Sequence, residues 1–111
     1  MATKAFEVLL TAGAKQDLEA LYDFIAEYDS PERADYVLDE IADAIKALAH
    51  HPERGSYPRE LLDLGIKEFR QIAFKPYRVI YRTTATQVFI YLIADDRRNL
   101  QALLNRRLLR S

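Results

Sequence analysis

Residues 66–98 constrain the fold more than any other part of the chain, because they read as three short strands in succession. The segments 67–74, 77–83 and 87–94 are rich in β-branched, aromatic and aliphatic residues, which fit a pleated and half-buried surface. Lys75-Pro76 and the polar run 83–86 separate the strands as turns. The third segment is apolar or aromatic throughout 88–93, which predicts a strand covered on both faces.

Two amphipathic helices are expected before these strands. Residues 14–28 and 31–49 each place apolar side chains at the three- and four-residue spacing of a helix that buries one face. Thr11 is positioned to cap the first helix, and Ser30 followed by Pro31 predicts the start of the second. So short a connection requires an antiparallel helical hairpin.

Three further segments complete the prediction. Residues 4–10 are long enough for one strand, and residues 53–65 form a loop that Leu61, Leu62 and Leu64 are expected to pin to the core. Asp96 is expected to cap a final helix that runs from Arg97 to about Leu109. The apolar stripe of this helix is Leu100, Leu103, Leu104 and Leu108, and its basic end is Arg106, Arg107 and Arg110.

The element order β-α-α-β-β-β-α predicts an α+β fold over residues 1–111 as a single domain. We expect a mostly antiparallel four-stranded sheet with the helical hairpin on one face and a C-terminal helix. The first strand is expected to run opposite to the second. In the strand 77–83, alternation predicts that Arg78, Ile80 and Arg82 share one face, whereas Tyr77, Val79 and Tyr81 share the other.

Charge is divided unevenly along the chain. Residues 1–64 hold six Lys or Arg against fourteen Asp or Glu, and residues 65–111 hold ten against three, so balances of −8 and +7 give the net charge of −1. The basic half either faces a polyanion or an acidic partner, or neutralises the acidic half within one fold. With zero cysteines, no signal-like apolar run and no membrane-length apolar segment, we expect a cytoplasmic protein that has no membrane partner.

The sequence lacks the residues that a phosphate-binding loop, a catalytic triad or a metal site would require. Three glycines form no phosphate-binding loop, and three serines offer little for a catalytic triad. His50-His51 lacks a third ligand, so the sequence predicts no metal and no cofactor. Arg, Lys and Tyr remain, and these can either stabilise charge and move protons in a metal-free ribonuclease or hold acidic groups of a partner. For the strand tyrosines, a packed position is the simpler interpretation.

The strand-helix-helix beginning, the segment PYRVIYR at 76–82, the strand VFIYLIAD and the ending RRNLQALLNRRL resemble the RelE/ParE superfamily of toxins from type II toxin–antitoxin modules. The resemblance implies a small growth-inhibiting toxin, often linked to plasmid stabilization, that forms a hetero-oligomer with a cognate antitoxin. The antitoxin is expected to contact Leu100, Leu103, Leu104, Leu108, Arg106 and Arg107. The same leucines would equally pack on the sheet, because both roles require the same spacing.

Two activities occur in this superfamily. Members of the ParE branch poison DNA gyrase, whereas members of the RelE branch cleave mRNA on the ribosome. By resemblance, Leu104 stands where the nuclease branch commonly has a tyrosine, and Ala73 stands where it has an arginine. The comparison therefore favours the ParE branch and a basic target-binding surface made of Arg97, Arg98, Arg78, Arg82 and Lys75.

Two alternatives stay open from the sequence. A ribosome-dependent nuclease would use Arg98, Arg78, Arg82 and Tyr81 as its charge and proton groups. An inactive relative would bind its partner only.

Overall fold

The computed structural model describes residues 5–109, except for the side chain of Leu109, and it has the expected α+β architecture. In chain order the elements are β1 (Glu7–Leu10), α1 (Ala12–Tyr28), α2 (Pro31–Ala47), α3 (Arg59–Leu62), β2 (Phe69–Phe74), β3 (Tyr77–Thr83), β4 (Gln87–Asp95), α4 (Leu100–Leu104) and the π-helical segment η1 (Asn105–Leu109). No described helix is long and apolar enough to cross a membrane.

The four-stranded sheet has the order β1-β4-β3-β2, and its β2–β3 and β3–β4 pairs are antiparallel. The prediction that the first strand opposes the second was wrong, because β1 runs parallel to β4 and therefore in the direction of β2. The helical hairpin returns the chain to the beginning of β1, where the Phe6 amide donates to the Ala49 carbonyl at 2.8 Å. The chain therefore leads into β2 from the same end of the sheet at which β1 begins.

The helical hairpin begins and turns where the sequence predicts. The Thr11 hydroxyl accepts the Ala14 amide at 3.2 Å, and the Ser30 hydroxyl accepts the Arg33 amide at 3.0 Å. Each cap satisfies a backbone donor that the first turn of a helix leaves without an intrahelical partner. Pro31 occupies the first turn of α2, where its missing amide proton costs nothing.

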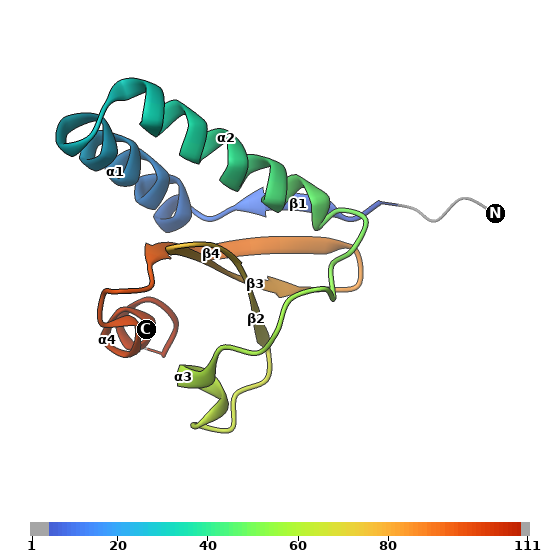
Figure 1. Cartoon of the computed structure of the whole chain (residues 1–111). Helices are drawn as coiled ribbons and strands as arrows, with labels where there is room; N and C mark the ends of the chain where they lie inside the picture. The colour runs from blue at the N-terminus through green and yellow to red at the C-terminus, as the bar shows by residue number, and fades with distance from the viewer. Residues whose placement is uncertain (1–4, 110–111) are drawn as a thin grey trace.

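Helices cover both faces of the sheet (Figure 1): α1 and α2 lie on one side, and α3 and α4 on the other. Along β4, Val88, Ile90 and Ile93 pack towards the hairpin, whereas Leu92 and Ala94 pack towards α4. The strict alternation breaks at Tyr91, because Ile80 pairs with Leu92 while Tyr81 pairs with Ile90. This β-bulge lets β4 serve two apolar cores at once.

The loop before β2 and the start of the final helix both differ from the prediction. The loop contains the short helix α3, which buries Leu61 but leaves Leu62 exposed, because one helical turn directs only part of its surface inwards. Leu64, in the turn after α3, is exposed as well. The final helix begins at Leu100 and is capped by Asn99, whose side chain accepts the Ala102 amide at 3.1 Å. Asp96 does not cap it, because the preceding turn already uses Asp95 to accept the amides of Arg97 and Arg98.

An ion pair joins the C-terminal segment to the first helix across the edge of β4. Arg107 donates to both carboxylate oxygens of Asp17 at 3.0 Å and to the Tyr91 carbonyl at 2.8 Å. Asp17 also accepts the Ile93 amide at 3.0 Å. Gly13 leaves room for this arrangement, since a Cβ there would stand 2.9 Å from the Arg107 guanidinium. The ion pair therefore provides hydrogen-bond partners for the Tyr91 carbonyl and the Ile93 amide of β4, just beyond the end of β1.

We predict that Arg107→Ala lowers the free energy of unfolding by about 2 kcal/mol, because it leaves a largely buried carboxylate without its cation. Arg106→Ala is the matched control, because the Arg106 side chain is exposed. This variant is expected to change the free energy of unfolding by less than about 0.5 kcal/mol. Urea unfolding at neutral pH measures both. Equal midpoints for the two variants would contradict a structural role for the ion pair.

Candidate functional site

The five cations predicted to face a target do not form one continuous cluster. Lys75, Arg97 and Arg98 lie at one end of the sheet, where Tyr77 of β3 pairs with Asp95 of β4. Arg82 lies towards the opposite end of β3, beside Phe69 and Phe89. Arg78 lies between these ends and points towards α3. The sheet therefore presents two separate basic regions with a neutralised arginine between them.

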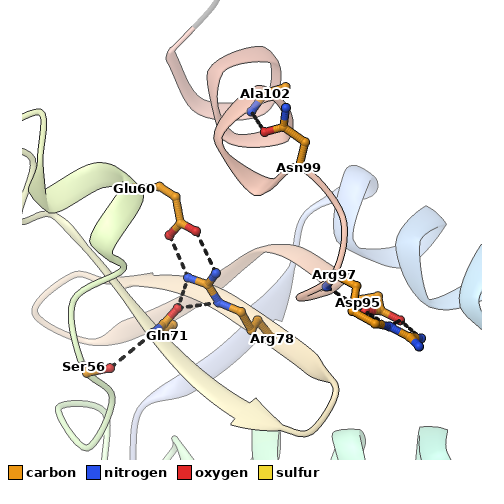
Figure 2. A network of polar contacts seen from close by, with 8 residues as sticks. All are labelled: Ser56, Glu60, Gln71, Arg78, Asp95, Arg97, Asn99 and Ala102. Atoms are coloured by element: carbon orange, nitrogen blue, oxygen red, sulfur yellow. Dashed lines mark hydrogen bonds and ion pairs between the residues drawn. The ribbon is translucent and has the colours of Figure 1, made fainter.

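Arg78 is held by groups of its own chain. It makes two bonds of 2.9 Å to the two Glu60 carboxylate oxygens, and its Nε donates to the Gln71 side chain at 2.7 Å. Figure 2 shows Glu60 reaching down from α3 to meet this guanidinium beside Gln71. Only 14% of the Arg78 side chain is exposed, and its hydrogen bonds to Glu60 lower the pKa of that carboxyl. Such a saturated guanidinium is structural, because little of it is left to bind phosphate.

Arg97 is paired but accessible. It folds back onto the Asp95 carboxylate two residues earlier and away from Arg78, as Figure 2 shows. Its side chain is 74% exposed, and hydrogen bonds from Arg97 lower the pKa of Asp95. An exposed pair of this kind contributes little to stability, so Arg97 can exchange its partner at small cost.

Besides Arg97, three of the predicted target-binding cations are exposed: Lys75, Arg82 and Arg98. None of them makes an ion pair within residues 5–109. Together with the accessible Arg97, they are the members of the predicted set that are available to a partner.

Tyr81 lies in the core. Its hydroxyl accepts the Gly55 amide at 3.0 Å and donates to the Pro52 carbonyl at 2.9 Å. Burial is the main cause that raises the pKa of this phenol. Because both hydrogen-bonding roles are filled by backbone and the ring has no solvent exposure, its position argues against proton transfer to a bound RNA.

Most of the side chains predicted to bind an antitoxin belong to the protein's own core. Leu100 and Leu104 are buried, and Leu103 and Leu108 pack against the same cluster beneath the sheet. Arg107 is committed to Asp17, which leaves Arg106 as the exposed member of that set. Of the two interpretations of the leucine stripe, the structure favours packing on the sheet.

A groove of about 410 Å³ runs between α1 and the end of β4. Leu21 and Phe24 of α1 form one wall, and Ile93, with Tyr77 of β3, forms the other. Arg97 and Arg98 also line it and are exposed. Sequence reasoning missed this groove, although Phe24 and Tyr28, four residues apart on α1 and 58% and 72% exposed, are a signal that could have been noticed.

A further exposed aromatic that sequence reasoning missed, Tyr57, lies beside the edge strand β2. Tyr57 stacks on Arg70, whose guanidinium carbon is 4.7 Å from the ring centroid, and Arg70 also donates to the Gly55 carbonyl at 2.9 Å.

His50 and His51 are both exposed at the end of α2. Within residues 5–109 no group of three or more His, Cys, Asp or Glu side chains is arranged to hold a metal ion.

Comparison with known proteins gives a consistent match. The family model described as the ParE toxin of the type II toxin–antitoxin system, parDE, matches residues 8–100. The chain resembles a solved structure of the chromosomal ParDE toxin–antitoxin system from P. aeruginosa, with a TM-score of 0.70 and 21% identity over 84% of this chain and 98% of that one.

It also resembles the toxin–antitoxin complex RelBE2 from Mycobacterium tuberculosis, with a TM-score of 0.57 and 23% identity over 85% of this chain and 94% of that one. A search of curated proteins finds no match. At these identities the structural likeness establishes the fold.

We predict that Tyr81→Phe destabilises the protein by about 1–3 kcal/mol, because it removes the partner of a buried amide and a carbonyl. Tyr91→Phe is the matched control: Tyr91 packs on Phe69 with ring centroids 5.3 Å apart, and its hydroxyl makes no hydrogen bond within the described residues. Thermal unfolding of both variants measures the difference. A control that loses as much stability as Tyr81→Phe would disprove this account.

Glu60 is predicted to make stability depend on pH. Because its pKa is lowered in the folded state, the ionised carboxylate stabilises the fold above its unfolded pKa, and this contribution is lost as the pH falls through the folded pKa. Glu60→Gln is therefore expected to be less stable by roughly 1–2 kcal/mol near pH 7, and the difference should shrink by about pH 3. Urea midpoints across this range test the prediction, with exposed Glu68→Gln as control. A gap that is constant with pH would contradict it.

Proposed function

Because the chain belongs to the ParE toxin family of type II toxin–antitoxin systems, we propose that it halts bacterial growth by inhibiting DNA gyrase. We further propose that a cognate antitoxin neutralises it within a hetero-oligomer.

The observation that carries the gyrase proposal is the fate of the residues that a nuclease would need. Arg78 is saturated by Glu60 and Gln71, and the Tyr81 hydroxyl is enclosed by backbone. Leu104, at the position suggested for a catalytic tyrosine, is a fully buried apolar side chain. Loss of the proton donor and of a charge stabiliser would each slow RNA cleavage by about two orders of magnitude or more.

The accessible cations support a binding role. Arg98 and Lys75 are exposed, and Arg97 is held only by a solvent-facing pair. They stand near the cis Lys75-Pro76 turn and the end of β4, so they form a basic rim at one end of the sheet. In the proposed function this rim contacts gyrase, and exposed Arg82 provides a second contact at the other end.

One observation keeps the nuclease alternative in view. Tyr57 is exposed and lies against Arg70, which combines a phenol with a cation on the β2 edge. A ribosome-dependent mRNA endonuclease built on this chain would use that pair in place of Tyr81, with Arg82 and Arg98 as further cations.

Induction of the chain alone in bacteria, with DNA and protein synthesis measured by pulse labelling in the first minutes, tests the proposal. We expect DNA synthesis to fall first, with DNA breakage, while translation continues. An immediate stop of translation with mRNA cut on ribosomes would instead establish the nuclease. Normal growth in the presence of soluble protein would rule out both toxic activities.

The basic rim is tested with purified gyrase. Arg98→Ala is expected to raise the concentration needed to inhibit supercoiling by about tenfold, the effect of losing one charged contact of roughly 1.4 kcal/mol. Lys46→Ala, which removes an exposed cation from the end of α2, is the control and should leave inhibition unchanged. If Arg98→Ala inhibits as well as the wild type, the rim is not the target contact.

A further inference from the structure

The first turns of α2 carry an arginine and a tyrosine that are exposed together. The Arg33 guanidinium carbon lies 5.2 Å from the centroid of the Tyr36 ring. Arg33 is exposed and makes no ion pair within residues 5–109, and Tyr36 is 49% exposed. The cap of α2 uses only the Arg33 amide, which donates to the Ser30 hydroxyl. The Arg33 guanidinium is therefore available to a partner.

These two side chains continue the basic rim around the end of the sheet. Tyr36 packs edge-to-face on Phe74 of β2, with ring centroids 6.3 Å apart, and Phe74 pairs with Tyr77 of β3. Burial raises the pKa of the Tyr77 phenol, whereas Arg97 and Arg33 both act to lower this pKa, so both guanidinium groups lie near the Tyr77 hydroxyl. Figure 1 shows the α1–α2 turn on the same side of the molecule as the end of β4.

We refer to Arg33, Tyr36 and Phe74 as the α2 patch. The basic rim by itself offers long cations but no large packed side chain, and a specific protein interface buries about 800 Å² on each partner. The α2 patch adds aromatic surface next to Lys75 of the rim. Arginine and tyrosine are also enriched among the few residues that supply most of the free energy of protein–protein binding.

Charges around the α2 patch favour a protein partner over a nucleic acid. Asp29, Glu32 and Asp35 are all exposed within the same segment, 29–36. Their carboxylates would repel a phosphate backbone, which is negatively charged along its whole length. A protein surface carries both signs of charge within a small area, so it can pair with Arg33 and avoid these carboxylates.

We propose that Arg33 and Tyr36 are a further part of the gyrase-binding surface, so that the target contacts α2 as well as the basic rim. The inference rests on the proposed function and adds two residues that determine how tightly the target is held. A carboxylate of gyrase pairs with the Arg33 guanidinium, and an apolar side chain of gyrase packs against the exposed part of the Tyr36 ring. Stacking on Tyr36 orders the Arg33 side chain before the partner arrives, which lowers the entropy lost on binding.

The test measures inhibition of gyrase supercoiling by the purified full-length chain. Arg33→Ala and Tyr36→Ala are each expected to raise the inhibitory concentration by about tenfold, because each removes a contact at the centre of the α2 patch. Arg33→Lys keeps the charge but loses the planar stacking group, so it should inhibit less well than the wild type and better than Arg33→Ala.

Two controls match these changes. Lys46→Ala removes an exposed cation from the opposite end of the same helix. Leu62→Ala truncates a side chain that is 41% exposed on α3, on the other side of the sheet. Both controls should inhibit gyrase as the wild type does. Urea midpoints are measured for every variant, so that a loss of inhibition by a folded variant identifies a loss of binding.

The outcomes separate this inference from the function on which it rests. If Arg33→Ala and Tyr36→Ala inhibit as well as the wild type while Arg98→Ala is weakened, the inference fails and the gyrase proposal stands. If the wild-type chain does not inhibit gyrase, the gyrase proposal itself fails and the inference falls with it.

Two binding measurements distinguish gyrase from other occupants of the α2 patch. Calorimetry with the purified protein encoded by the neighbouring reading frame tests for an antitoxin contact. Variants that lose this binding and keep full inhibition of gyrase would overturn the assignment. Fluorescence anisotropy with a labelled DNA duplex tests for a nucleic-acid contact. Binding of the duplex at physiological salt that Arg33→Ala abolishes would also overturn it, because the partner would then be DNA.

Discussion

The rest of the structure depends on β4 being covered on both faces. A strand that is apolar on both sides cannot face water on either, so one layer of helices is not enough. The α1–α2 hairpin covers Val88, Ile90 and Ile93, and α4 covers Leu92 and Ala94. The bulge at Tyr91 allows the change of face, and Arg107 takes the carbonyl that the bulge presents. Burial of both faces of β4 therefore accounts for the two helical layers and for the position of the C-terminal ion pair.

Charge is divided between structural and accessible groups in the same way. Arg78 and Arg107 are paired with Glu60 and Asp17, and each pair joins a helical element to the sheet. The cations at the end of the sheet, above all Arg98, have no such commitment. A simple count of basic residues along β3 and the C-terminus therefore overstates the surface available to a partner. In the proposed function, the accessible arginines form a binding surface beside the α1–β4 groove and not a catalytic centre on the sheet.

The local elements of the fold could be predicted because their causes are local. Ser30 and Pro31 begin α2 through a cap and a fixed backbone angle, and the β3 pattern assigns Val79 and Tyr81 to one face and Ile80 to the other. The prediction of the direction of β1 was wrong, because this direction depends on the end of the sheet to which the helical hairpin returns the chain. The predicted start of α4 was wrong, because Asp95, and not Asp96, accepts the hydrogen bonds of the turn before this helix.

The candidate site was less predictable than the fold. The sequence by itself determined the order of the four strands and of the α1–α2 hairpin, the caps of these two helices, the doubly buried strand and the supply of arginines, because spacing and side-chain chemistry fix these properties residue by residue. Only the tertiary structure decided that Glu60 takes Arg78, that backbone encloses the Tyr81 hydroxyl, and that β4 extends past β1, where Asp17 and Arg107 hydrogen-bond to its edge. Each depends on residues 18 or more positions apart meeting in space, and no local pattern records such a meeting.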